Sequence, residues 1–315
     1  MFIVRRRKIF FALSGILSAV SIAAMFAFGF DVSIDFKGGT LTEVRFAEPA
    51  RTTDGVSRQN DSVGLESGGR PARTEVESKI NALNLGGFSV RPSGDANYAV
   101  RTRELSADER QALIEALGNP FVERQNTIGP VAGAELKDKA IKAVLVVMLM
   151  IVLFVTFAFR KVSRPVSSWK YGLATVIALA HDVVIPTGVF IFLGKLYGLE
   201  IDLLFISGLL AILGYSVHDT IVVFDRVREN LRVNAEKNFK EDFEATVGKS
   251  VAQTFGRSIN TSLTIFITLL ALYLVGSAAT KDFASLLIIG IIVGTYSSIF
   301  VASPLLVTFY KLQRK

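Results

Sequence analysis

Several ionisable residues lie inside apolar stretches of this 315-residue chain. His218 and Asp219 stand side by side in the segment GYSVHDTIVVFDRVREN, which begins at Gly214. His181 and Asp182 form a second such pair in an earlier apolar stretch. A carboxylate at the centre of a membrane-spanning helix costs roughly 2.5–3.5 kcal/mol on insertion scales. Such a residue is by default a candidate for function, for example a carboxylate whose protonation changes during transport.

Asp219 has a candidate counter-charge in the next apolar stretch. Arg257 begins that stretch at the same membrane surface, and a polar stripe at helical spacing starts with it: Arg257, Asn260, Thr261, Thr264 and Thr268. Two interpretations remain open at this point. Asp219 is a proton-exchanging group, or Asp219 and Arg257 form a static pair that locks two helices together.

Two enzymatic alternatives use the same residues. His181, Asp182, His218 and Asp219 could ligate a metal if the two stretches met at the same depth. A hydrolase triad of Ser216, His218 and Asp219 is disfavoured, because adjacent helical residues cannot form a nucleophile–base–orienter chain. We predict no enzymatic activity, no metal and no cofactor.

Composition indicates a membrane protein. Half of the residues are hydrophobic and the mean hydropathy is +0.45, values too apolar for an ordinary soluble domain. Cysteine is absent, which excludes disulfides and thiolate sites. Apolar runs long enough to cross a bilayer predict six spans, at 9–29, 140–159, 172–193, 203–224, 259–276 and 283–309.

The basic residues predict the orientation. They concentrate at the N-terminus, in the 160–171 and 225–257 connections and in the C-terminal tail, whereas the short connections on the other side hold only Lys195 and Lys281. Cytoplasmic loops carry such an excess. Both termini and loop 225–257 are therefore expected in the cytoplasm, and the net charge of +7 reflects this bias. We expect contact with membrane lipids and none with nucleic acid.

Residues 31–138 are expected to form a small extracytoplasmic α+β domain between the first two spans. The first strand is expected at 42–47, where residues alternate, and a capping box at Thr74–Glu77 opens the first helix. Two strands follow at 88–91 and 97–102, joined by a turn at Pro92 and Gly94. A second capping box at Ser106–Glu109 opens another helix, and a last strand is expected at 121–126. The order β-α-β-β-α-β is that of a ferredoxin-like unit. Residues 50–72 read as a mobile insertion.

The expected organisation is therefore a polytopic α-helical membrane protein with three parts. These are the N-terminus with the first span (1–30), the α+β domain (31–138) and five further spans (139–315). Glycine and proline flank the two connections to the domain, which predicts either a hinge or static turns. The hinge candidates are Asp35, Gly38, Gly39, Gly129, Pro130 and Gly133.

Four segments carry a resemblance to a known family. DFKGGT from Asp35, GPVAGAEL from Gly129, ALAHD from Ala178 and GYSVHDTIVVFDRVREN resemble motifs of the SecD/SecF family, in its six-span SecF branch. The resemblance covers nearly the whole chain, and the combination of motifs is specific. It implies the architecture of the resistance–nodulation–division (RND) transporters, with Asp219 as the proton-pathway carboxylate and Arg257 as its arginine. The candidate proton pathway comprises Asp219, Arg257, His218, Asp182 and Thr261.

The resemblance also implies a function and partners. It implies a complex with SecD at the SecYEG channel, with YajC, in the cytoplasmic (inner) membrane. That complex would use the proton motive force to draw preproteins across the membrane after the ATP-driven step of SecA. An RND-type proton-coupled exporter of small molecules or lipids is the alternative, although such exporters carry two bundles and larger outer domains in one chain.

Overall fold

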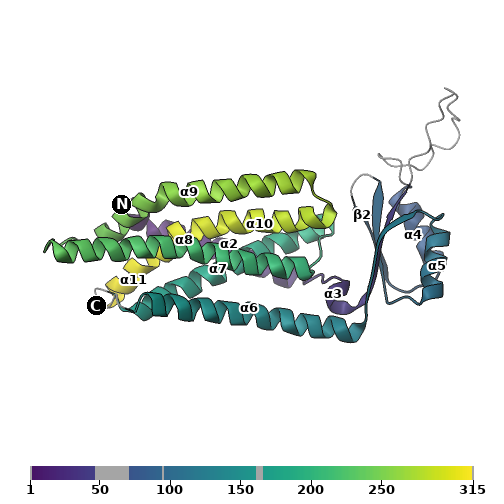
Figure 1. Ribbon diagram of the computed structural model, residues 1–315, viewed down its shortest axis with the longest axis horizontal. Coiled ribbons are helices and arrows are strands. Elements are labelled where there is room, and N and C mark those ends of the chain that lie inside the picture. The colour runs from purple at the N-terminus through teal and green to yellow at the C-terminus, as the bar shows by residue number, and fades with distance from the viewer. Residues whose placement is uncertain (1, 47–70, 94–95, 161–165, 314–315) are drawn as a thin grey trace, which may run out of the picture. The chain divides into compact units, whose positions relative to one another are not determined.

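The computed structural model describes residues 2–46, 71–93, 96–160 and 166–313. The chain divides into two compact units, one formed by Met1–Asp31 with Ala140–Lys315 and the other by Val32–Lys139. Most of the predicted 50–72 insertion lies outside the described residues. Figure 1 shows the helices of the first unit and the small sheet of the second.

The first unit is a helical bundle that follows a short helix, α1 (Phe2–Arg5). Six helices among the described residues are long and apolar enough to cross a membrane, which confirms the six predicted spans. They are α2 (Arg7–Phe28), α6 (Pro130–Ala158), α7 (Ser168–Tyr197), α8 (Leu203–Glu236), α9 (Phe243–Val275) and a last span made of α10 (Ala278–Ser297), η1 (Ser298–Ala302) and α11 (Ser303–Gln313).

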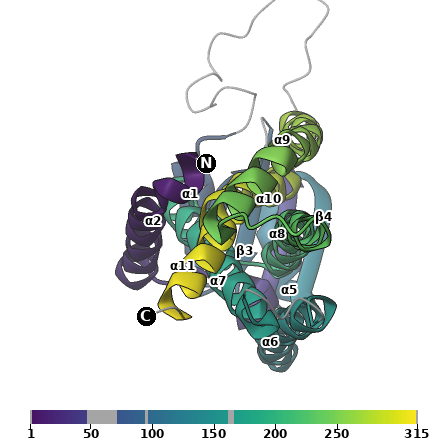
Figure 2. The same cartoon turned by 90° about the vertical axis from the view of Figure 1, so that its left-hand side faces the viewer.

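Helices α7, α8 and the last span form the centre of the bundle. About half of their most apolar windows is buried, against 11% for α2, α6 and α9. Figure 2 looks along the bundle and shows α10 between its neighbours. Glycines allow this approach, because a Cβ at Gly290 would overlap the Ile212 side chain and one at Gly294 would lie 3.1 Å from Cβ of Ser216.

Helix α2 carries a row of small residues that does not pack against a helix of this chain. Gly15, Ala19 and Ala23 are exposed and face away from this chain's own bundle. The contact with α7 is made instead by Ser21, which lies where a Cβ at Gly188 would be. Spacing alone reveals a row of small residues but not which side of the helix is turned inward.

The predicted loop 225–257 is mostly helical. Helix α8 continues to Glu236 and α9 begins at Phe243, so only residues 237–242 separate them. Beyond the apolar part of α8, oppositely charged side chains one turn apart stabilise the helix. For example, Nε of Arg232 lies 2.8 Å from Oε1 of Glu236. The charge that ended the apolar run therefore did not end the helix.

The first residues of α2, the start of α9 and the end of α11 lie together at one end of the bundle. Glu244 of α9 lies 3.3 Å from Nη1 of Arg7 and also pairs with Lys311 of α11. We call this the terminal end of the bundle; Figure 1 shows α11 and the start of α9 there. The start of α2 and the end of α11 thus lie at the same end of the bundle.

The second unit has the ferredoxin-like order of elements. After the short helix α3 (Ile34–Lys37), its antiparallel strands are arranged β2-β3-β1-β4. The elements run β1 (Gly39–Arg45), α4 (Arg73–Ala82), β2 (Phe88–Ser93), β3 (Asn97–Thr102), α5 (Ala107–Ala116) and β4 (Phe121–Ile128). Helices α4 and α5 cover one face of the sheet (Figure 1) and enclose a core that includes Val44, Ile80, Val100 and Leu113.

The caps and turns predicted from the sequence of this unit are only partly confirmed. The capping box of α5 is present, with Glu109 N donating to Oγ of Ser106 at 3.2 Å. The predicted box at Thr74–Glu77 is wrong: α4 begins at Arg73, and Glu77 pairs with that arginine at 2.7 Å. Pro92 lies in β2 rather than in a turn, as an edge strand permits, and Gly94 lies outside the described residues.

The two connections of this unit pack against each other. Gly38 has φ of 79°, and a Cβ there would lie 2.8 Å from Cα of Pro130. A Cβ at Gly133 would lie 2.9 Å from the backbone N of Gly38, and one at Gly39 would lie 2.5 Å from the carbonyl oxygen of Thr102. Asp35 lies in the first turn of α3, with its backbone N bonded to Ser33 Oγ at 3.1 Å, and Gly129 directly precedes α6. The motifs DFKGGT and GPVAG therefore meet at one glycine-rich junction.

Replacing Gly38 by alanine is expected to destabilise the second unit by about 2 kcal/mol, since the left-handed backbone and the overlap with Pro130 both oppose a Cβ. Gly86→Ala is the control, because Gly86 has φ of 83° and no atom within 4 Å of its Cβ position. It should cost only about 1 kcal/mol. Hydrogen exchange of the 32–139 amides in the full chain measures both, and equal losses would refute the packing contribution.

Candidate functional site

The buried carboxylate Asp182 binds residues of three helices. Its side chain is fully buried, and Oδ2 accepts hydrogen bonds from the hydroxyls of Ser216 on α8 and, at 2.6 Å, Ser297 at the end of α10. Its Oδ1 lies 2.9 Å from Nδ1 of His181. These three contacts engage both carboxylate oxygens, so Asp182 links α7, α8 and α10 at the bundle centre.

His181 continues this cluster toward α2. Its ring stacks on Tyr296, with centroids 6.1 Å apart and an interplanar angle of 20°. The Tyr296 hydroxyl donates to the carbonyl of Phe10 at 3.1 Å and accepts from Ser14 at 3.3 Å. Nε2 of His181 is buried without a partner among the described residues.

A π-helical turn follows these contacts. Residues 298–302 form η1, in which Oγ of Ser303 donates to the carbonyl of Ser298 at 2.9 Å. The Ser298 hydroxyl lies 2.8 Å from Oγ1 of Thr220 on α8 and donates to the Ser216 carbonyl at 3.2 Å. Such turns occur frequently at functional sites. This one places consecutive serines of the last span against α7 and α8.

Asp219 differs from Asp182 in its hydrogen bonding. It is 2% exposed, and its Oδ2 has no partner among the described residues. The buried hydroxyl of Ser258 on α9 faces the Asp219 carboxylate and interacts with it, but the two groups do not meet in good hydrogen-bond geometry. An unsatisfied buried carboxylate is costly when charged. A proton on Asp219 would therefore remove the cost of keeping this carboxylate charged.

The static pair of Asp219 with Arg257 is absent from this structure. Neither residue forms an ion pair with a described residue, although the charges of His218 and Arg257 both act on Asp219. Arg257 and His218 are instead exposed. The interpretation of Asp219 and Arg257 as a helix lock has no geometric support here.

The predicted polar stripe of α9 faces away from this chain's own helices. Arg257, Asn260, Thr264 and Thr268 are exposed, and Thr261 is half-buried, with its carbonyl accepting from Thr264 at 2.8 Å. With His218 these residues make what we call the polar face, defined as His218, Arg257, Asn260, Thr261, Thr264 and Thr268. At membrane depth such a face requires a polar partner or water.

A second row on α9 was missed by the sequence analysis. Ser250, Thr254 and Ser258 are buried, and Ser262 follows one turn later. Ser262 lies 2.6 Å from both Tyr215 on α8 and Thr295 on α10. The spacing of four residues was present in the sequence and could have revealed this row.

In the described part of the chain, the residues of the two enzymatic alternatives do not come together as a metal site or a hydrolase triad. No three His, Asp or Glu side chains there come together as metal ligands. His181 and Asp182 bind each other, whereas His218 points to the exposed side. Ser216 donates to Asp182 on the neighbouring helix rather than to His218. The site is thus an intramembrane hydrogen-bond network beside an unsatisfied carboxylate.

Fold and site define a multi-pass helical membrane protein with ionisable groups at bilayer depth and one small α+β unit. The family described as "Protein export membrane protein SecD/SecF, C-terminal" matches residues 110–312. The chain belongs to this SecD/SecF family, as its motifs indicated.

Relatives support this assignment over nearly the whole length. "Protein translocase subunit SecF" of Thermobaculum terrenum is 38% identical and aligns with 98% of this chain and 93% of its own. "Protein translocase subunit SecDF" of Thermus thermophilus is 37% identical, covering 95% of this chain but only 37% of the relative.

A solved structure shows the same fold. The crystal structure of SecDF, described as a translocon-associated membrane protein from Thermus, matches 99% of this chain with a TM-score of 0.78 and 32% identity. This chain corresponds to 38% of that longer chain. The similarity therefore covers both units of the present protein.

Proposed function

We propose that this chain is a SecF-type subunit of a protein translocase. In this role it uses the proton motive force, together with a SecD-type subunit, to promote preprotein translocation across the cytoplasmic membrane. The observation that carries the proposal is Asp219, a buried carboxylate with an unpartnered oxygen at membrane depth. The near full-length similarity to SecF subunits supplies the translocase context.

The need for a partner follows from the polar face. Arg257 and Asn260 are exposed on α9 and His218 on α8, where lipid would leave them unsatisfied. The SecDF relative supports a partner of the SecD type, because this chain spans 37% of that longer protein. The family resemblance adds SecYEG and YajC as neighbours and SecA as the motor that acts first.

Protonation of Asp219 is the proposed switch. The ionised Asp219 can only accept from the Ser258 hydroxyl on α9, whereas a protonated Asp219 can donate a hydrogen bond to that hydroxyl. The ionised form is favoured by the positive charges of Arg257 and, when protonated, His218. Proton uptake thus changes what holds α8 to α9, which gives the two protonation states different packing.

Asp182 is proposed to transmit this change. Its three hydrogen-bond partners come from α7, α8 and α10, and Ser216 lies one turn before Asp219 on α8. A movement of α8 therefore alters the contacts of Asp182 and the adjacent π-helical turn. Each charge moved through 100 mV supplies about 2.3 kcal/mol, which suits repeated small steps on a passing chain.

The junction of Gly38, Gly39, Gly129, Pro130 and Gly133 is proposed to carry motion to the α+β unit. We propose that both termini lie in the cytoplasm, which the distribution of basic residues supports, and that the α+β unit lies on the opposite side of the membrane. The unit then acts outside the cytoplasm on emerging preprotein. Close packing at Gly38 and Gly133 supports a defined joint rather than a loose linker.

Reconstitution tests the proposal. The chain, its SecD-type partner and the SecYEG channel are placed in vesicles with SecA and a preprotein, and export is measured before and after a protonophore dissipates the gradient. The complex should raise export only while the gradient is present. Equal stimulation without a gradient would refute the proton-driven function.

A further inference from the structure

An apolar groove runs along α9 from the terminal end of the bundle. Its first part is a cavity of about 260 Å³ between α1 and α9, which includes Phe2 and Ala252 in its lining. Its second part is a cavity of about 320 Å³ between α9 and the last span, which extends as far as Phe266. Phe255 lines both cavities, so they follow one another along α9.

The α9 side of this groove is a single face of the helix. Ala252, Phe255, Ile259, Leu263 and Phe266 line the two cavities and recur every three or four residues. The rise from the first to the last of them is about 21 Å along the helix. One leaflet of a bilayer with its headgroups is about 20–22 Å thick, so the groove has the length of a lipid molecule in one leaflet.

The groove suits a hydrocarbon chain. Ile259 and Leu263 are 40% and 51% exposed, and the hydroxyl groups beside them are bonded within the protein. Oγ of Ser262 lies 2.6 Å from Oγ1 of Thr295, and the Tyr296 hydroxyl donates to a backbone carbonyl of α2 at 3.1 Å. A ligand in the groove is therefore stabilised by burial of its apolar surface.

A cation lies at the α1 end of the groove. The guanidinium carbon of Arg6 lies 4.8 Å from the centroid of the Phe2 ring, which itself lines the first cavity. Arg6 is exposed and has no ion-pair partner in the described parts of the chain, and Arg5 and Lys8 are also exposed. Arg7, by contrast, is paired with Glu244. The groove thus combines an apolar channel with positive charge at one end, which matches an anionic lipid.

The polar face lies on the other side of α9. Arg257 follows Phe255 by two residues and Thr264 follows it by nine, which are rotations of about 200° and 180° around the helix. A partner subunit that covers the polar face would therefore leave the groove open to lipid.

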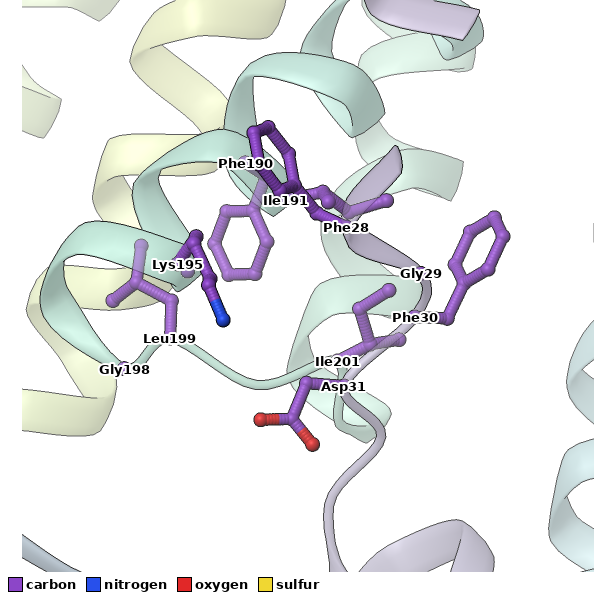
Figure 3. Close-up of a pocket in the computed structure, with 11 residues that line it drawn as sticks. Phe28, Gly29, Phe30, Asp31, Phe190, Ile191, Lys195, Gly198, Leu199 and Ile201 are labelled. Carbon is purple, nitrogen blue, oxygen red and sulfur yellow. The ribbon is translucent and has the colours of Figure 1, made fainter. Parts of the chain in front are cut away.

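A cavity at the opposite end of the bundle lacks this combination (Figure 3). It has a volume of about 450 Å³ and lies between the end of α2 and the turn after α7. Its lining contains Lys195 and Asp31, whose charges are opposite and give no net positive charge. It therefore offers no electrostatic preference for an anionic lipid, and Lys195 provides a control for the charge of Arg6.

We propose that the groove along α9 binds an anionic phospholipid from the leaflet at the terminal end of the bundle. The Arg6 guanidinium binds the phosphate, and one acyl chain fills the groove from Ala252 to Phe266. Because the first cavity is formed by both α1 and α9, the bound lipid holds α1 against α9.

Native mass spectrometry of the delipidated complex of this chain with its six-span partner tests the headgroup contact. The probes are dioleoyl-phosphatidylglycerol and dioleoyl-phosphatidylcholine, and the measured quantity is the dissociation constant of the first lipid bound. Phosphatidylglycerol should bind at least tenfold more tightly. Arg6→Gln should weaken its binding about tenfold, the loss expected for one charge-assisted hydrogen bond. Arg6→Lys should retain most of the affinity, because a cation remains.

A second pair of variants tests the acyl-chain contact. Ala252→Phe fills the groove and should weaken binding of both lipids about tenfold. Ala271→Phe makes the same change at an exposed position of α9 outside both cavities and should have no effect. Lys195→Gln should likewise leave binding unchanged.

Three results would overturn the proposal. The first is unchanged binding by Arg6→Gln, or an equal loss with Lys195→Gln. The second is phosphatidylcholine binding as tight as that of phosphatidylglycerol, or an equal effect of Ala252→Phe and Ala271→Phe. The third is no binding of phosphatidylglycerol to the assembled complex, which would show that the partner subunit covers the groove.

Discussion

Replacing Asp219 by asparagine is expected to abolish gradient-driven export while the chain still folds and assembles. Asparagine keeps the shape of the side chain but removes the titration, and a neutral amide costs less to bury than a charge. The buried Ser258 hydroxyl that faces Asp219 can also pair with the new amide. Export with and without a gradient, compared at equal yield of the complex, measures the effect.

Asp182→Asn is the matched comparison, a second buried carboxylate in the same bundle. Oδ2 of Asp182 accepts from Ser216 and Ser297 and Oδ1 faces His181, so an amide NH₂ there would face donors or a ring nitrogen. We expect this variant to lower the yield of the complex. Normal assembly of Asp182→Asn with complete loss of gradient dependence would instead place Asp182 in the proton pathway itself.

Arg257→Met separates the switch from a static pair. It should impair export, because it removes a cation that favours the ionised form of a nearby carboxylate, and Asp219→Glu should keep partial function. A static pair would give damage to assembly in each single variant and recovery when Asp219→Asn and Arg257→Met are combined. A stable Asp219→Asn complex with unchanged gradient-dependent export would contradict the hypothesis that Asp219 is the proton switch.

The chain without a six-span partner is expected to give no gradient-dependent stimulation of export and to be unstable in the membrane. The polar face of α8 and α9 would contact lipid, and a single charged residue there costs roughly 2.5–3.5 kcal/mol on insertion scales. Reconstitution of the purified chain alone and together with its SecD-type partner measures the difference. Full stimulation by the chain alone would contradict this expectation.

Variants of the polar face locate the partner contact. Asn260→Leu and Thr264→Leu should reduce co-purification of the partner, because both side chains are exposed on α9. Leu149→Ala is the control, since Leu149 is exposed on α6, far along the sequence from the polar face. An equal loss of the partner in all three variants would assign the effect to general destabilisation rather than to the polar face.

The sequence by itself determined the local features of this protein. Apolar length predicted the six spans, because crossing a bilayer requires about 20 consecutive residues whatever they contact. Alternation and turn residues predicted the β-α-β-β-α-β order, and the cap at Ser106 was found because its partner Glu109 lies only three residues away. Asp219 stood out because a carboxylate in an apolar run is recognisable without any structure.

Only the tertiary structure decided which polar groups meet. Asp182 binds hydroxyls 34 and 115 residues away along the chain, and no local pattern encodes how α7, α8 and α10 are rotated against one another. The same rotation turns Ser258 inward and Arg257 outward on α9, although the two residues are adjacent. A helical period fixes the spacing of a stripe, but packing against neighbouring helices fixes the direction in which the stripe points.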